Sequence, residues 1–253
     1  MLGVTVQMTT LMPAASAISA IAAPATSKTT RLLSPNGKIA VELSTGTDQV
    51  SYTVFKDGKA VYEMKDIRLV TGGETFPNKG VKVGKTQFRT DRIQPVVPLK
   101  FSTIDTEYNE TEISLGKGVS MRLRMMDNCV AYRFVMDRKG DVEVYDDHFL
   151  LVPGDGFVAH YQTARSFNTS SEEPYRSTSL AEWAASDRPM GTSPLLLSDP
   201  EDTQLLIGES DLDDYPHLFL TTDGTAILPT YPKAPIRWEP RGDRSEEIVE
   251  EAP

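Results

Sequence analysis

The sequence predicts an all-β protein, a large antiparallel β-sandwich, and three observations lead to this prediction. From Leu32 onward apolar and polar residues alternate with a period of two, which is typical of strands with one buried face. Three pairs of such runs are joined by short turn sequences. Helical signal is scarce, and its best candidate is the short segment 179–185. Hairpins without intervening helices favour antiparallel sheets packed face to face.

Two of the hairpins are defined by their turns. The run 50–55 (VSYTVF) leads through Asp57-Gly58 into the run 60–62, and Asp and Gly are the residues that tolerate the positive φ of a two-residue turn. A similar Asp223-Gly224 pair lies inside the run 218–228. Both segments are therefore expected to fold back on themselves.

The remaining hairpin, 119–135, predicts which residues face the core. Its apolar residues alternate with polar ones that include Arg122 and Arg124, so we expect one apolar, buried face and one cationic, outer face. The predicted core positions are Val119, Met121, Leu123, Val130, Tyr132 and Phe134.

Composition excludes several classes of protein. With 26 basic and 36 acidic residues the net charge is −10, which repels nucleic acid and anionic lipid surfaces. No apolar run after residue 30 approaches the ~20 residues that span a bilayer, so no membrane span is expected. Cys129 is the single cysteine, which excludes an internal disulfide, and we expect it to be a small buried hydrophobic residue.

Three regions follow from the same survey. Residues 1–28 are a signal peptide or a disordered leader: the first 25 carry no charge and end near Ala20-Ile21-Ala22, a small-x-small pattern typical of signal peptidase sites. The protein is thus expected to be exported, to the periplasm or outside the cell. Residues 29–239 form the sandwich, and residues 240–253 are a polar, acidic tail.

An acidic segment, 208–216 (GESDLDDYP), is a candidate metal site. It follows the apolar run 205–207, which would fix the position of Glu209 at a strand end. Carboxylate oxygens are ligands that calcium prefers, and calcium takes 6–8 of them. The segment lacks the spacing of a self-contained calcium loop, so a solvated acidic loop remains the alternative.

A second acidic segment contains Glu172, Glu173 and Tyr175. Paired carboxylates hydrolyse glycosides when they lie about 5–9.5 Å apart across the sugar. Adjacent residues point to opposite sides, so this pair fits catalysis poorly and a loop contact is the alternative. Aromatic residues that could stack on sugars, or simply pack in the core, are Trp183, Trp238, Tyr161, Tyr175, Tyr215 and Tyr231.

Four stretches together resemble the N-terminal domain of glycoside hydrolase family 97, a group of α-glucosidases and α-galactosidases common in gut Bacteroidetes. They are the entry 33–39 (LSPNGKI), the hairpin at 57–59, the strand motif at 108–110 (YNE), and 208–216, which is similar to the family's Glu-x-x-Leu-x-Asp-Tyr run. The resemblance covers about residues 29–253.

The resemblance implies a galactose-mutarotase-like supersandwich that packs on a (β/α)₈ catalytic barrel lying beyond Pro253. It implies that the parent protein is a calcium-dependent α-glycoside hydrolase acting on α-linked oligosaccharides, and that this chain is inert alone. Glu209 is then a calcium ligand or an active-site wall residue, with Tyr215 beside it, and Glu173 and Tyr175 contact substrate. The alternatives are a stand-alone carbohydrate-binding module and, more weakly, a self-contained hydrolase that uses Glu172 or Glu173.

Overall fold

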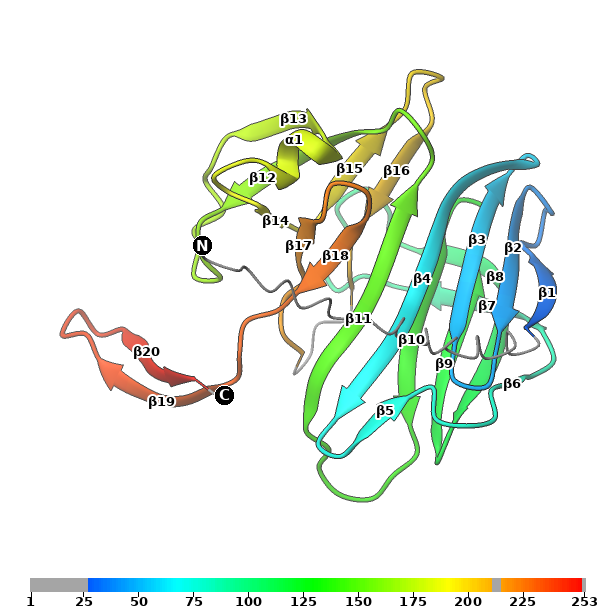
Figure 1. Cartoon of the computed structure of the whole chain (residues 1–253), viewed down its shortest axis with the longest axis horizontal. Coiled ribbons are helices and arrows are strands. Elements are labelled where there is room, and N and C mark those ends of the chain that lie inside the picture. The colour runs from blue at the N-terminus through cyan, green and yellow to red at the C-terminus, as the bar shows by residue number, and fades with distance from the viewer. Residues whose placement is uncertain (1–26, 211–214, 252–253) are drawn as a thin grey trace, which may run out of the picture.

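The computed structural model describes residues 27–210 and 215–251, which form an all-β fold of two main sheets (Figure 1). The predicted leader lies outside these ranges except for its last two residues, and Lys28 already begins β1. Within the described ranges no helix is long and apolar enough to cross a membrane.

The larger sheet has 13 strands and is antiparallel throughout, in the order β1-β2-β3-β4-β11-β18-β17-β14-β12-β15-β16, with β5 on β4 and β13 on β12. Its strands are β1 (Lys28–Leu33), β2 (Ile39–Thr45), β3 (Val50–Lys56), β4 (Lys59–Thr71), β5 (Glu74–Phe76), β11 (Val144–Pro153), β12 (Val158–Ala164), β13 (Tyr175–Ser179), β14 (Met190–Thr192), β15 (Leu195–Ser198), β16 (Gln204–Ile207), β17 (Phe219–Thr222) and β18 (Ile227–Thr230).

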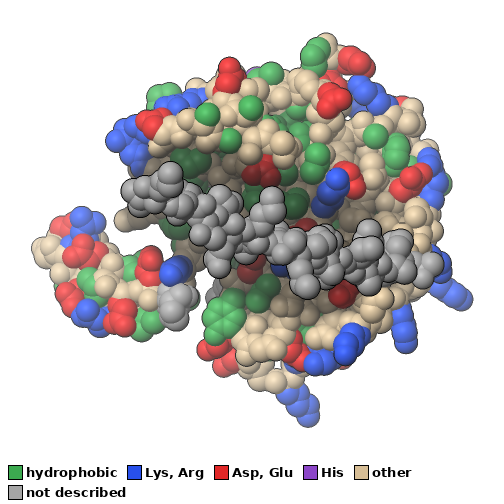
Figure 2. Space-filling model, in the orientation of Figure 1, with side chains coloured by type: hydrophobic (Ala, Val, Ile, Leu, Met, Phe, Trp, Pro, Cys, Tyr) green, Lys and Arg blue, Asp and Glu red, His purple; other side chains and the backbone are tan. Residues whose placement is uncertain are grey.

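The smaller sheet has five strands in the order β10-β9-β8-β6, with β7 also on β8, and it lies behind β2–β4 in Figure 1. Its strands are β6 (Lys82–Val83), β7 (Gln87–Ile93), β8 (Ile104–Gly116), β9 (Val119–Met125) and β10 (Val130–Met136). A separate hairpin of β19 (Pro235–Pro240) and β20 (Glu246–Glu251) extends away from the two sheets, so the expected polar tail, 240–253, begins inside a hairpin. Acidic and basic side chains both lie on this hairpin (Figure 2).

The core lies between the two sheets, as the alternation predicts. Leu43 of β2, Tyr52 of β3 and Ile113 of β8 belong to one apolar cluster with the inward residues of β9. All three hairpins are present: β3 pairs with β4, β9 with β10 and β17 with β18. Asp57 and Gly58 both have positive φ, at 49° and 84°, which is why these two residue types form that turn.

The predicted core face of the hairpin 119–135 is confirmed for β9 and partly for β10. Val119, Met121 and Leu123 are buried. The three predicted residues of β10 pack against the same cluster but are only half-buried, because β10 is the edge strand of its sheet. Arg122 and Arg124 lie on the outer face, where their guanidinium groups contact Glu112 at 3.3 Å and Glu110 at 2.7 Å on β8.

Two shorter predictions had different outcomes. The segment 179–185 does contain a helix, α1 (Leu180–Ala184), which begins with a capping box: the Ser179 hydroxyl accepts a hydrogen bond from the Glu182 amide, and the Glu182 carboxylate accepts one from the Ser179 amide. The prediction that Cys129 is buried is wrong, because the residue is exposed. It lies in the turn between β9 and β10.

Candidate functional site

Glu209 is held at the end of a strand, two residues after β16. Its side chain is only 16% exposed, and its Oε1 accepts a hydrogen bond from the Leu218 amide at 2.8 Å. The same oxygen lies 2.6 Å from Nδ1 of His217. These contacts pin the two ends of the segment 209–218 together, although residues 211–214, which hold the other predicted carboxylates, lie outside the described ranges.

Among the described residues, the contacts of Glu209 fall on one of its two carboxylate oxygens. Both contacts use Oε1, so the described residues leave Oε2 without a hydrogen bond. Within the same ranges no group of three His, Cys, Asp or Glu side chains is close enough to hold a metal ion. The hard carboxylate oxygen suits calcium, but it supplies one or two of the 6–8 oxygens that calcium requires. Any calcium bound here needs ligands from outside the described residues.

Sequence reasoning did not find His217 as the partner of Glu209. The structure places this histidine against the carboxylate and edge-on to Phe219, with ring centroids 5.2 Å apart. His160 is held between the hydroxyls of Ser177 and Ser198, at 2.8 and 2.7 Å. The available signal for His217 was its position directly before the run 218–228, which predicted a hairpin.

Tyr215 directs its hydroxyl to a different carboxylate from the predicted one. It donates a hydrogen bond to Oδ2 of Asp147 on β11 at 3.1 Å, and its ring packs edge-on against Tyr231 at 6.2 Å. Glu209 is still near enough for its charge to help raise the pKa of Tyr215. The role of Tyr215 as an orienting neighbour of Glu209 stays a prediction.

Asp147 is the acidic residue that sequence reasoning missed. Burial raises the pKa of its carboxyl to about 6, the Tyr215 hydrogen bond lowers it, and the charge of Asp146 raises it. Its Oδ1 is buried and accepts no hydrogen bond from the described residues. Perturbed carboxyls of this kind occur at functional sites and at interfaces. The available signal was an acidic pair, Asp146-Asp147, in a strand whose other residues, apart from His148, are apolar or aromatic.

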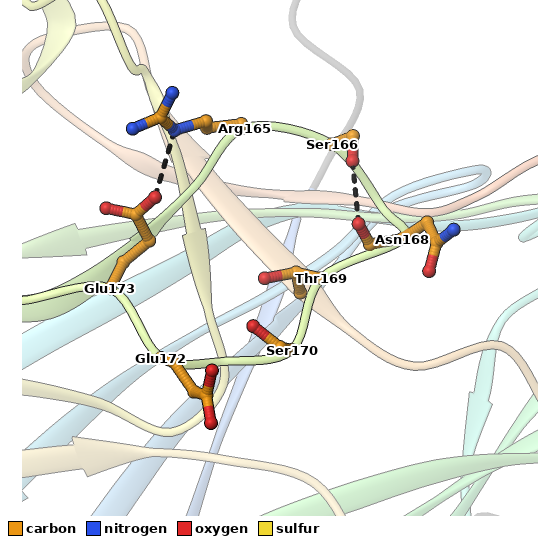
Figure 3. A pocket seen from close by; sticks show the side chains of 7 residues that line it. All are labelled: Arg165, Ser166, Asn168, Thr169, Ser170, Glu172 and Glu173. Carbon is orange, nitrogen blue, oxygen red and sulfur yellow. Dashed lines mark hydrogen bonds and ion pairs between the residues drawn. The ribbon is translucent and has the colours of Figure 1, made fainter.

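Glu173 is bound on both carboxylate oxygens. Oε1 accepts a hydrogen bond from Arg165 and Oε2 one from Arg188, each at 2.9 Å, and the hydrogen bond from Arg165 is the main cause of a lowered pKa of Glu173. Glu172 next to it is exposed and points in another direction (Figure 3). The two carboxylates are thus not arranged as a catalytic pair. This agrees with the expectation that adjacent residues point to opposite sides.

A polar hollow of about 370 Å³ lies beside Glu173. Hydroxyl, amide and carboxylate groups line it, as Figure 3 shows, and they belong to Arg165, Ser166, Asn168, Thr169, Ser170, Glu172 and Glu173. Tyr175, at the start of β13, is 69% exposed. The hollow has the polar lining that sugar hydroxyls require, and Tyr175 provides an exposed ring on the same segment.

The other aromatic candidates divide into core and surface. Trp183 and Tyr161 are fully buried and stacked, with ring centroids 4.0 Å apart, so they pack the core under α1 and do not face sugars. Trp238 is half-exposed on the separate β19–β20 hairpin. Tyr175, two residues after Glu173 in the sequence, is therefore the predicted ring that is exposed next to a segment that lines the hollow.

Comparison with known proteins gives a family match from the sequence and a matching fold from solved structures. A family profile described as "Glycosyl-hydrolase 97 N-terminal" matches residues 32–249. A retaining alpha-galactosidase of Bacteroides thetaiotaomicron is 24% identical over 221 residues, which are 81% of this chain and 33% of that protein. Two structures of a glycoside hydrolase family 97 enzyme from Pseudoalteromonas sp. strain K8, one with acarbose and one with panose, each have a TM-score of 0.65 and 20% identity.

The match covers one part of these relatives. Each of the two structural alignments spans 83% of this chain and 32% of the solved chain, so the chain corresponds to about a third of the length of its relatives. The shared part has the antiparallel two-sheet fold described above. From the family match over residues 32–249, the chain belongs to the N-terminal domain family of glycoside hydrolase family 97.

Proposed function

We propose that this chain is the accessory domain of an exported, calcium-dependent α-glycoside hydrolase. In this proposal it packs on the parent's own catalytic barrel and forms part of the wall of the active-site cleft. The chain alone is inert. The observation that carries the proposal is Glu209, a carboxylate fixed by two contacts to one oxygen, while its other oxygen has no hydrogen bond from the residues that the structure describes. The family match supports the accessory role. The α-linked substrate is suggested by the relatives described as an alpha-galactosidase and as acarbose and panose complexes.

Glu209 would hold the calcium ion through Oε2, with the remaining oxygens supplied by the barrel. A calcium ion at such a position supplies positive charge that can orient and polarise substrate oxygens. Tyr215, whose hydroxyl donates a hydrogen bond to Asp147, would keep the segment after residue 214 in place. His217 would hold the Glu209 carboxylate in its orientation.

Glu173 and Tyr175 would contribute the substrate-facing part of the wall. Because Arg165 and Arg188 occupy both oxygens of Glu173, its role is to shape the hollow and to keep the neighbouring hydroxyls and amides in position. Tyr175 would contact the flat face of a sugar ring.

The test of the calcium proposal is Glu209→Gln in the parent enzyme, compared with Glu107→Gln, an exposed carboxylate on β8. We expect Glu209→Gln to raise the calcium concentration needed for half-maximal activity at least about tenfold, since calcium affinity follows ligand charge. Glu107→Gln should leave this concentration unchanged. An unchanged calcium requirement with an unchanged rate would return Glu209 to a solvated acidic loop.

The alternative, a carbohydrate-binding module, rests on the exposed ring of Tyr175 and on the polar hollow lined by the segment that precedes it in the sequence. Titration of the chain with maltooligosaccharides separates it from an accessory domain: saturable binding that Tyr175→Ala abolishes favours the module. Nitrophenyl glycosides with calcium test the remaining class, because turnover by this chain alone would refute the proposal that it is inert.

A further inference from the structure

Strand β7 and the loop that joins it to β8 form an exposed arm, residues 87–103. All seven residues of β7 are exposed. Apolar side chains gather at the tip of the arm, where Val96 is 99% and Leu99 90% exposed, with Val97 and Phe101 close to them in sequence. Exposed apolar patches on folded proteins mark interaction sites. The exposed apolar residues therefore indicate that the arm is an interaction surface.

β7 is also an unprotected sheet edge. It pairs with β8 from Gln87↔Glu110 to Ile93↔Ile104 without a register shift, and among the described residues β8 is its sole partner strand. Natural edge strands usually carry charged side chains, a proline, a bulge or very few residues, which prevent pairing with another chain. β7 has no proline and no bulge, and its charged residues, Arg89, Asp91 and Arg92, include both signs. Its outer row of backbone amides and carbonyls is therefore open to a further strand of complementary charge.

The sequence of β7 is complementary to itself in the antiparallel direction. If two copies of β7 pair with Thr90 opposite Thr90, then Arg89 of each copy lies opposite Asp91 of the other. In the same register Phe88 lies opposite Arg92, a cation–π pair. Directly opposed unlike charges and cation–aromatic pairs are the contacts that stabilise antiparallel strands.

The internal contacts of β7 allow this pairing. Asp91 accepts a hydrogen bond from the Tyr108 hydroxyl at 2.7 Å and lies 3.9 Å from the Arg124 guanidinium, both through Oδ2, so lone pairs remain for a second donor. Arg92 contacts Asp105 at 2.6 Å, but both side chains are more than half exposed, so the guanidinium face stays accessible. Arg89 contacts Gln87 of its own strand, a neutral partner that a carboxylate can replace.

We propose that two copies of this chain associate through β7, antiparallel, with Thr90 on the two-fold axis. A closed two-fold contact of identical surfaces is the commonest form of protein association. In this arrangement the chain after Ile93 of one copy passes the chain before Gln87 of the other, so each apolar tip lies against the base of the partner's arm. The same geometry thus uses the open edge and covers the exposed tip.

The charge pattern favours a second copy over an unrelated strand or a further domain. In a register centred on Thr90, Arg89 and Asp91 of each copy pair with Asp91 and Arg89 of the other, which gives two ion pairs. The contact is small: seven strand residues and four apolar tip residues from each copy, against about 20–30 residues a side for a standard interface. The dimer should therefore dissociate on dilution.

Disulfide crosslinking of the 253-residue chain tests the register, with Cys129→Ser as the background because Cys129 is exposed. Opposed residues of antiparallel strands have Cβ atoms about 4.5–5.5 Å apart, so Thr90→Cys should form a covalent dimer under mild oxidation. Phe88→Cys is the matched control: the two residues 88 lie four positions apart along the strands, roughly 13 Å, beyond the reach of a disulfide.

The expected result is a covalent dimer for Thr90→Cys, none for Phe88→Cys, and a dimer again when Arg92→Cys is added to Phe88→Cys. Equal crosslinking of the two single variants, or crosslinking of neither, would overturn the register. Circular dichroism checks that each variant retains its β-sheet fold.

Analytical ultracentrifugation gives an independent measurement. We expect a concentration-dependent dimer that Arg89→Glu weakens about tenfold, because two like-charge pairs replace two unlike ones. Lys56→Glu, which makes the same change of charge at the exposed end of β3, should leave the dimer unchanged. A chain that is monomeric at all concentrations, or a dimer insensitive to Arg89→Glu, would refute the proposal.

Discussion

The substitution Asp147→Asn should stabilise the domain at neutral pH. The carboxyl is largely buried, its Oδ1 has no hydrogen bond within the described residues, and its pKa is raised from the ordinary 3.8 to about 6. Ionised Asp147 is therefore less favourable in the folded chain than in the unfolded chain. Asparagine has nearly the same shape, keeps an acceptor for the Tyr215 hydroxyl, and carries no charge to bury.

The magnitude follows from the pKa. At 1.36 kcal/mol per pKa unit, the difference between 3.8 and about 6 corresponds to up to about 3 kcal/mol. Between these two values the folded chain binds more protons than the unfolded chain, so the contribution of this group to the free energy of unfolding falls as pH rises from about 4 to about 6. Above about pH 6 the loss is complete and constant.

Urea denaturation of the wild type and of Asp147→Asn at several pH values from 4 to 8 measures this effect. Other carboxyls titrate in the same range, so the relevant quantity is the difference between the two proteins, which should be near zero at pH 4 and reach up to about 3 kcal/mol in favour of the variant at pH 7. Asp48→Asn, an exposed aspartate, serves as the control and should show little difference at any pH. A destabilisation by Asp147→Asn that is equal at pH 4 and pH 7 would refute the reasoning.

Three further predictions concern the helix cap, a tight packing position and the exposed thiol. Ser179→Ala removes the acceptor of the α1 capping box and should lower the free energy of unfolding by about 1 kcal/mol in urea denaturation. Gly191→Ala places a Cβ 3.0 Å from the Tyr161 ring and 3.2 Å from the Trp183 ring, and should cost about 1–3 kcal/mol in the same assay. Cys129 should react with Ellman's reagent in the folded protein, and the rate should rise with pH because the thiolate is the reacting form. Since burial raises the pKa of this thiol, the rise should lie at higher pH than for an ordinary cysteine.

Controls for these three predictions are available in the chain. Ser102→Ala changes an exposed serine of the arm and should leave stability unchanged. Gly46→Ala adds a Cβ that meets its nearest neighbour, Gln49, at an ordinary 3.6 Å and should be mild. Full stability of Ser179→Ala or Gly191→Ala, or a Cys129 thiol that reacts only after denaturation, would contradict the corresponding argument.

The parts of the fold that the sequence predicted are those with local causes. The turn at Asp57-Gly58, the hairpin 119–135 and the helix after Ser179 each follow from neighbouring residues, and each is confirmed. The order of strands in the sheets is not local: β11 pairs with β4 and β18, from opposite ends of the chain. A periodic pattern states that a strand has a buried face and leaves its partners open.

The same distinction explains the site. Glu209 was found because it follows an apolar run, whereas the burial of Asp147 arises from segments that are distant in sequence, including Tyr215 68 residues away. Likewise, exposure of Cys129 and partial burial of the β10 residues depend on β10 being an edge strand. Alternation alone does not separate an edge strand from a central one.

The two acidic residues predicted to be functional differ in what their carboxylates can still bind. Glu173 has an arginine on each oxygen, so a metal ion could bind it only by displacing an ion pair. Glu209 receives both of its contacts on one oxygen, and these contacts, from a backbone amide and a histidine, fix the carboxylate without using the other oxygen. A ligand that is already oriented loses little conformational freedom on binding, which favours binding there. Under the proposed function, calcium binding should therefore depend on Glu209. Glu173→Gln should alter the hollow beside Glu173 and leave the calcium dependence of the parent enzyme's activity unchanged.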